Sequence, residues 1–252
     1  KMILHIPHSK KLIPKEFLNY FLISEDQIEI ELLKMTDHFT DELFDASEEN
    51  CSKLIFPVSR ILVDPERFID DSQESMSKKG MGCVYEKTHD GKPLKDCGDD
   101  KRLLIDKFYI PHHQEFNMLV NERIKKENQT LIIDCHSFPK YPLPYETDQT
   151  KDRPQICIGT DYFHTPPELT EKMVSHFSKE GFSVETNRPF SGSIVPSEHF
   201  QNSENVKSIM IEVRRDLYMD EETGSKTENF DELNEKIKNI LNEIEMDWNI
   251  DF

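Results

Sequence analysis

The sequence predicts one α/β domain in which buried strands alternate with amphipathic helices along 252 residues. Short apolar runs at 2–6, 131–135 and 207–213 are typical of buried strands, because turn residues or charged residues bound them. Apolar residues recur at helical spacing over 25–46 and 231–248. We find no internal repeat and no clear linker, so we expect the whole chain to form a single unit.

The other elements follow from the same patterns. Pro111 should kink or restart a helix over 100–127, and Pro166 should open a helix over 166–179. The polar, glycine-containing stretch 70–98 predicts a long irregular excursion, with a hairpin around 82–85, and such stretches are often functional. Further extended segments are expected at 53–58, 61–63, 155–159 and 183–185.

The composition limits the classes of partner and compartment. The chain has 31 Lys and Arg against 49 Asp and Glu, a net charge of −18, which disfavours nucleic acids and anionic membrane surfaces. An acidic protein can still bind an anionic substrate where a few arginines focus on one cleft. The five cysteines show no metal-ligand spacing, which is typical of free thiols. We expect a cytoplasmic protein, because no signal peptide and no membrane-spanning apolar run is evident.

Two histidines lie where apolar runs end. His8 follows the first run through Pro7, and His136 follows the run at 131–135. Because open α/β sheets collect their chemistry at the carboxyl ends of strands, these imidazoles should meet at one edge of the sheet. Catalytic zinc takes three protein ligands from His and Asp or Glu and keeps one position open for water. The two histidines therefore predict a divalent metal site.

The third ligand is expected from the segment 36–41, which contains Asp37 and Asp41. On the predicted helix these acids are four residues apart and share one face. A solvated acidic surface is the structural alternative. His5 is three residues before His8 and should face the other side of a strand, so we assign it to the core or to the surroundings of the metal.

A glutamate between apolar neighbours marks the third strand end. Glu212 lies near the end of the run at 207–213, and a buried glutamate is rare unless it is paired or functional. Beside a metal, Glu212 would be a natural general base for a bound water. A salt bridge to a neighbouring arginine is the structural alternative.

Two arginines flank the short apolar segment 61–63. Guanidinium groups grip carboxylates through two hydrogen bonds, so Arg60 and Arg67 are candidates for binding a dicarboxylate substrate. Pairing of Arg67 with Asp64 at the surface is the alternative. The turn-rich loop 187–193 offers amide and hydroxyl groups for substrate contacts.

Other nucleophile and phosphate motifs are absent. The sequence contains no GxSxG, GxGxxG or GxxxxGK[ST] segment. Cys135 and His136 are adjacent on a predicted strand and should point to opposite faces, which disfavours a thiol–imidazole pair. His112 and His113 follow Pro111 and suit either surface or structural roles.

Six short segments form a pattern that covers nearly the whole chain. They are His-Ile-Pro-His-Ser at 5–9, Thr-Asp at 36–37, Ser-Arg-Ile-Leu-Val-Asp at 59–64 with Arg67, Asp-Cys-His-Ser at 134–137, Asn-Arg-Pro-Phe-Ser-Gly at 187–192 and Ile-Glu-Val-Arg-Arg-Asp-Leu-Tyr at 211–218. Together and in this order they resemble the N-formylglutamate amidohydrolase family. The resemblance implies a zinc-carboxypeptidase-like (phosphorylase/hydrolase-like) fold, with a mixed, mostly parallel sheet between helices. It also implies hydrolysis of N-formyl-L-glutamate to formate and glutamate, the last step of one histidine-degradation route.

The resemblance also implies residue roles. His8, Asp37 and His136 would hold one divalent metal, and Glu212 would act as the base. Asp37, in the Thr-Asp pair, matches the family pattern better than Asp41. Mixed His and carboxylate ligation favours Zn²⁺ over harder ions. The substrate side would be lined by Arg60, Arg67, His113, which matches a Pro-x-His position of the family, Asn187 and Gly192.

The chain departs from the family pattern at two places. Lys10 follows His-Ser where the family usually has Gly, and Glu66 replaces Asn in the frequent Asp-x-Asn-Arg segment. These changes leave the expected ligands in place and alter the pocket wall. The alternatives are therefore a deacylase or carboxypeptidase-like metallohydrolase of another substrate, and a non-catalytic protein that binds an acidic amino acid. The oligomeric state stays open.

Overall fold

A six-stranded sheet forms the centre of the computed structural model, which describes residues 1–46 and 51–251. The strands lie in the order β2-β1-β3-β6-β4-β5. The first four are mutually parallel, β4 is antiparallel to β6, and β5 is parallel to β4. The expected mixed, mostly parallel sheet is therefore confirmed. The strands are β1 (Met2–Ile6), β2 (Cys51–Ile55), β3 (Thr130–Phe138), β4 (Ile156–Thr160), β5 (Val184–Thr186) and β6 (Val206–Arg214).

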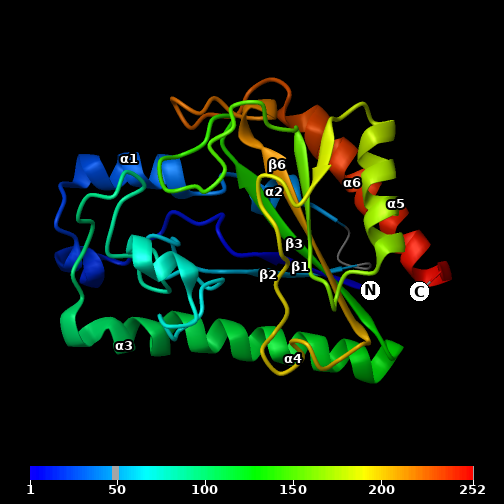
Figure 1. Cartoon of the computed structure of the whole chain (residues 1–252), viewed down its shortest axis with the longest axis horizontal. Helices are drawn as coiled ribbons and strands as arrows, with labels where there is room; N and C mark the ends of the chain where they lie inside the picture. Colours follow the sequence, from blue (N-terminus) through cyan, green and yellow to red (C-terminus); the bar gives the residue numbers. More distant parts are fainter. Residues whose placement is uncertain (47–50, 252) are drawn as a thin grey trace.

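Helices cover both faces of the sheet (Figure 1). On β3, Leu131, Ile133 and Cys135 pack in one core cluster with apolar residues of the helices α5 and α6, whereas Ile132 packs with Phe116 of α4. Alternate residues of a strand thus point to opposite helix layers. The α-helices are α1 (Glu25–Met35), α2 (Thr40–Leu43), α3 (Lys101–Leu104), α4 (Ile110–Glu127), α5 (Pro167–Lys179) and α6 (Phe230–Asp251), and 3₁₀ turns span Lys15–Tyr20, Ser75–Lys79, Gly98–Asp100 and Arg215–Leu217.

The continuous helix predicted over 25–46 is wrong. α1 ends at Met35, since Thr36 has extended backbone angles of φ −77° and ψ 138°. Phe39 is left-handed, with φ 61°, and α2 begins only after it. The segment between the two helices contains Asp37, and its backbone N–H donates to the carbonyl of His8 at 3.0 Å. The interruption therefore brings Asp37 against the end of β1.

The segments at 61–63 and 82–85 also differ from the prediction. Segment 61–63 is a turn rather than a strand, because Leu62 and Val63 both donate to the carbonyl of Ser59. Its apolar side chains are buried in a second core with α1, which explains the strand-like composition. No hairpin forms around 82–85 in the described chain, and a bridge between Lys87 and Pro93 lies further on. In Figure 1 the chain that follows β2, coloured cyan, lies between α1 and α3.

The other expected helices and strands are confirmed, with two refinements. The helix over 100–127 consists of α3, a π-helical segment (Ile105–Tyr109) and α4, and Pro111 lies in the first turn of α4 as expected for a restart. β3 continues to Phe138, because its pairing with β6 extends to Arg214. His136 therefore lies inside β3, two residues before the strand ends at Phe138. Among the described residues, no helix is long and apolar enough to cross a membrane.

Candidate metal centre

Three neighbouring strands present polar side chains on the face that α4 covers. The register pairs His5 with Asp134 and His136 with Glu212. Residues opposite each other in a parallel pair share a face, and so do residues two apart on one strand. His5, Asp134, His136 and Glu212 therefore lie together near the carboxyl ends of β1, β3 and β6. His8 joins them two residues beyond the end of β1.

The helix interruption separates the two candidate acids. Asp37 is 1% exposed and faces the histidines, whereas Asp41 is 20% exposed and its Oδ2 pairs with Lys10 Nζ at 2.6 Å. The predicted shared helical face of Asp37 and Asp41 is thus wrong, because no helix connects them. Lys10 engages Asp41 outside the cluster. The geometry selects Asp37 as the carboxylate that lies with His8 and His136.

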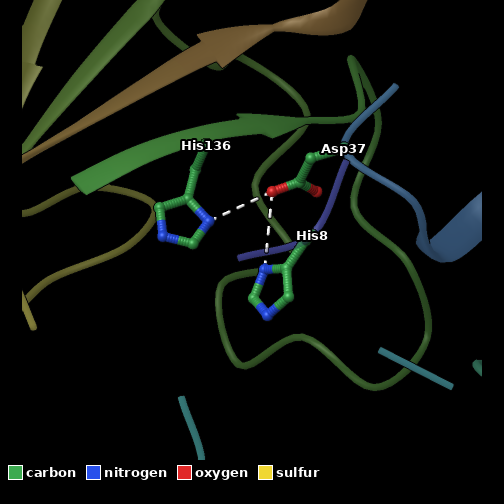
Figure 2. Close-up of side chains that lie close together, drawn as sticks. All are labelled: His8, Asp37 and His136. Atoms are coloured by element: carbon green, nitrogen blue, oxygen red, sulfur yellow. Dashed lines mark hydrogen bonds and ion pairs between the residues drawn. The ribbon is translucent and has the colours of Figure 1, made fainter. Parts of the chain in front are cut away.

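Both imidazoles turn the same nitrogen toward one carboxylate oxygen (Figure 2). Nδ1 of His136 lies 3.1 Å and Nδ1 of His8 lies 3.6 Å from Oδ2 of Asp37. The three ligand atoms of this group lie within 4.8 Å of one another. Nδ1 of His8 is buried and has no hydrogen-bond partner among the described residues. A buried nitrogen without a partner is costly, so its orientation toward Asp37 fits a bound cation.

Nε2 of each histidine and Oδ1 of Asp37, the atoms that point away from the shared Oδ2, each have a hydrogen-bond partner. Nε2 of His8 lies 2.9 Å from Oδ1 of Asp64, and Nε2 of His136 lies 3.2 Å from Oε1 of Glu66. Arg215 donates from Nη2 to Oδ1 of Asp37 at 2.9 Å. Metal-bound histidines commonly donate their other ring N–H to a carboxylate, which fixes the tautomer and orients the ring. The two Nδ1 atoms and Oδ2 of Asp37 therefore face one another, and Nδ1 of His136 forms a hydrogen bond with this oxygen.

The electrostatics of the group favour positive charge. Burial opposes protonation of His136, but the carboxylates of Glu66 and Asp134 outweigh it and hold the pKa of His136 well above its ordinary value. Burial likewise opposes ionisation of Asp37, but the hydrogen bond with His136 and the nearby charges of His8 and Arg215 hold the pKa of Asp37 well below its usual range. These residues fit a divalent cation, because the surrounding carboxylates already stabilise a positive charge beside the imidazole.

Glu212 lies beside His136 with one oxygen free. Its Oε2 is buried and has no hydrogen-bond partner among the described residues. Burial raises the pKa of Glu212 to about 8. The alternative of a salt bridge to a neighbouring arginine does not hold in the described chain, since Arg214 pairs with Asp216 and Arg215 with Asp37. A carboxyl group that titrates near neutral pH beside a cation site suits proton transfer.

The two candidate arginines converge on one buried acid. Nη2 of Arg60 lies 3.0 Å and Nε of Arg67 lies 3.8 Å from Oδ2 of Asp64, which is fully buried. Tyr85 also donates to this oxygen. The Asp64 pairing considered for Arg67 thus exists, but in the interior rather than at the surface. Nε of Arg67 is buried without a hydrogen-bond partner among the described residues, and the side chain is 24% exposed.

The remaining sequence candidates are spread around the centre. Nε2 of His113 lies 2.7 Å from the carbonyl of Pro65, next to Glu66. The side chain of Asn187 is exposed and bonds both the backbone N–H and the hydroxyl of Thr160, so it shapes its own loop. Gly192 has φ 96°. Its carbonyl passes so close to β4 that only glycine fits at position 159.

Sequence reasoning missed the groups that hold the ligands from behind. Asp64 and Glu66 were considered for an ion pair and for the pocket wall, and Arg215 had no signal beyond a charged strand end. Asp134 did carry a signal, because it is two residues from His136 on one strand and must share its face.

Comparisons with known proteins show the family and the fold of the chain. A family model described as N-formylglutamate amidohydrolase matches residues 1–219. The chain belongs to this family. The N-formylglutamate amidohydrolase family is a family of hydrolases, so membership supports a hydrolase. No protein in the curated collection matches the chain.

Two solved structures share the fold of this family member. The N-formylglutamate amidohydrolase from Ralstonia eutropha JMP134 superimposes with a TM-score of 0.82 at 21% sequence identity, over 97% of this chain and 92% of that chain. A gene product of Agrobacterium tumefaciens gives a TM-score of 0.65 at 17% identity, over 97% of this chain and 91% of that chain. At these identities the likeness shows the fold alone, and the expected α/β architecture is confirmed.

Proposed function

We propose that the chain is a metal-dependent amidohydrolase that cleaves N-formyl-L-glutamate to formate and glutamate, or a related N-acyl amino acid to the free amino acid and the carboxylate of its acyl group. Buried Nδ1 of His8 carries the proposal, since it lacks a partner and faces the same Asp37 oxygen as Nδ1 of His136. Glu212, with its unpartnered oxygen, lies beside His136 on the next strand. Family membership supports the amide-hydrolase class.

His8, Asp37 and His136 would hold the cation, for which Zn²⁺ is the favoured identity. When bound, the cation would polarise the scissile carbonyl and lower the pKa of an attacking water to about 7. Glu212 would take the proton of that water at Oε2 and deliver it to the departing amine nitrogen. Its raised pKa, about 8, suits both halves of this transfer near neutral pH.

Arg60 and Arg67 would bind the acidic part of the substrate. Nη1 of Arg60 lies 3.9 Å from Oδ1 of Asp37, so its guanidinium already reaches the centre. The buried, unpartnered Nε of Arg67 leaves donors for a carboxylate. We assign His113, Asn187 and Gly192 to the walls of the substrate side, and we place the enzyme in the cytoplasm, in histidine degradation.

One observation favours the second candidate, a deacylase of a less acidic substrate. Glu66 is 16% exposed, the most accessible of the carboxylates that contact the two ligand histidines. A carboxylate in the wall opposes a second carboxylate on the substrate by like-charge repulsion. The order of reactivity among N-formyl-glutamate, N-formyl-glutamine, N-acetyl-glutamate and a dipeptide separates the two candidates.

The proposed function is tested by measuring formate release and metal content together. Purified chain loaded with Zn²⁺ should release formate from N-formyl-L-glutamate. Glu212→Gln should keep the metal and lose about 10²- to 10⁴-fold in kcat, the range expected for a general base. Substantial activity in this variant would remove Glu212 from the base role. Thermal stabilisation by the substrate without any product from the panel would indicate a binding protein instead.

A further inference from the structure

A row of buried contacts leads away from His136 on the side opposite Asp37. Nε2 of His136 lies 3.1 Å from Oδ1 of Asp134, and the same oxygen lies 2.9 Å from Nδ1 of His5. Nε2 of His5 then lies 3.0 Å from Nε2 of His112 on α4. Every side chain in this row is at most 5% exposed. The row thus connects a metal-ligand candidate on β3 to a helix on the outside of the sheet.

Hydrogen positions along the row follow from the chemistry of the groups. An ionised Asp134 only accepts, so Nδ1 of His5 and Nε2 of His136 both carry hydrogens toward it. When Nδ1 holds the single ring hydrogen of His5, Nε2 of His5 accepts and His112 donates from its own Nε2. Burial lowers the pKa of His112 to about 2, so His112 is neutral and has one hydrogen to give. A hydrogen on Nε2 of His136 would leave Nδ1, the atom that faces Asp37, as the ring nitrogen available to a cation.

Packing holds the row in place. The ring of His5 stacks on Phe116, with centroids 4.8 Å apart and an angle of 3° between the planes. Phe56 packs edge-on against His112, with centroids 5.0 Å apart. The other oxygen of Asp134 accepts from the backbone N–H of Ile194 at 3.2 Å. Rotation of either histidine would therefore break both a hydrogen bond and an aromatic contact.

The row is an orienting network rather than a second cation site. His5, Glu66 and Asp134 also form a group of possible ligands, with His5 Nδ1 3.7 Å from Oε1 of Glu66. Unlike His8 Nδ1, both ring nitrogens of His5 have hydrogen-bond partners. The group therefore satisfies itself, and a cation would have to displace existing hydrogen bonds.

We propose that His5 and His112 are positioning residues that fix the tautomer and orientation of His136 through Asp134, and so set the metal affinity of the centre. The neighbouring His113 donates from Nε2 to the carbonyl of Pro65. The next residue, Glu66, is the other carboxylate that contacts Nε2 of His136. Two consecutive histidines of α4 thus support both carboxylates behind His136. This role rests on the proposed metal site, but not on the identity of the substrate.

The test measures Zn²⁺ affinity by competition with a chromophoric chelator, without substrate. His112→Leu should weaken Zn²⁺ binding about tenfold and His5→Leu about 10- to 100-fold, the range known for outer partners of metal ligands. His112→Gln keeps an N–H donor and should restore most of the affinity. The visible spectrum of the Co²⁺ form should change in both Leu variants, because the ring of His136 reorients.

His164→Leu is the matched control. His164 is fully buried and also has two hydrogen bonds, to the Val206 carbonyl and from the Gln201 N–H, at the amino end of β6. This variant should lose thermal stability and keep wild-type Zn²⁺ affinity. Because His5 is central to β1, His112→Leu on α4 keeps the test open if His5→Leu does not fold.

Two results would overturn the positioning role. One is wild-type Zn²⁺ affinity and an unchanged Co²⁺ spectrum in folded His112→Leu. The other is uptake of two Zn²⁺ per wild-type chain but one by His5→Leu, since His5 would then be a ligand itself. Lack of formate release with the expected affinity changes would overturn only the proposed activity.

Discussion

The centre at the sheet edge and the group Glu31–His89–Asp90, which extends from buried Glu31 to exposed Asp90, contain similar residues but differ in how their hydrogen bonds are satisfied. Both bring histidine and carboxylate atoms within 4.8 Å of one another. Around Glu31, one oxygen accepts from the ring of His89 and the other from its backbone N–H. Asp90 pairs with Lys92 and accepts from the Thr88 hydroxyl. At the sheet edge, by contrast, His8 Nδ1 and Glu212 Oε2 are buried and have no hydrogen-bond partner in the part of the chain that the structure describes.

The comparison shows that proximity of potential ligands does not by itself mark a metal site. The Glu31 group closes on itself and ties the excursion to α1, so it needs no further ligand. The sheet-edge group holds the outer atoms of its histidines and of Asp37, and among the described residues it leaves Nδ1 of His8 without a hydrogen-bond partner. Buried polar atoms without partners are rare in native proteins, so these two atoms support the proposed cation site and the proposed base.

The largest effect should separate the two groups directly. His136→Ala should abolish stoichiometric Zn²⁺ binding, because it removes one of three ligands, whereas His89→Ala should leave the metal content unchanged. Metal analysis after dialysis measures both. Loss of metal in His89→Ala, or its full retention in His136→Ala, would reverse the assignment of the two groups.

A smaller effect should come from the acid behind His8. Asp64→Asn removes the charge that orients Nε2 of His8 and should weaken Zn²⁺ binding about 10- to 100-fold. Asp41→Asn is the control, since Asp41 pairs with Lys10 outside the centre. Chelator competition compares the two variants. Equal affinities would show that the carboxylate behind His8 does not tune the ligand.

A buried lysine beside the second core tests, through the pH dependence of stability, how burial acts on an ionisable group. Lys95 is 2% exposed and donates to the carbonyls of Ile61 and Tyr85. Burial lowers the pKa of Lys95 from 10.5 to about 7. Between these values the unfolded chain binds a proton that the native chain has released, so this group makes stability rise with pH.

Lys95→Met removes this titration. The stability of the variant relative to wild type should be greatest near pH 7 and should fall by up to about 1.4 kcal/mol per pH unit toward pH 9. Urea unfolding at pH 7, 8 and 9 measures the difference. Parallel stability profiles of the two proteins would show that Lys95 titrates at its ordinary pKa in the native chain.

The smallest effect is expected in the self-satisfied group. Glu31→Gln weakens the contact with His89 and should cost about 1 kcal/mol of stability, as for an ordinary hydrogen bond. Zn²⁺ affinity and activity should not change. A drop in metal affinity would mean that the group is coupled to the sheet edge.

The sequence by itself determined the α/β class, most strands and helices, and the convergence of His8, His136 and Glu212, because strand ends and side-chain alternation are local properties. Local periodicity was misleading at 25–46 and 61–63. In the first segment the backbone of Asp37 bonds to His8, and in the second apolar side chains fill a second core from a turn.

Only the tertiary structure decided how the ligands are held. Asp37 meets His136 across 99 positions and Arg215 across 178, and no pattern within a few residues encodes such contacts. Arg60 and Arg67 differ, because both are within four residues of Asp64 and spacing permits the pairing. Only the folded chain decided that the three side chains meet in the interior. Side-chain orientation at the centre depends on hydrogen bonds between distant strands, because each donor takes the acceptor that the folded backbone brings within reach.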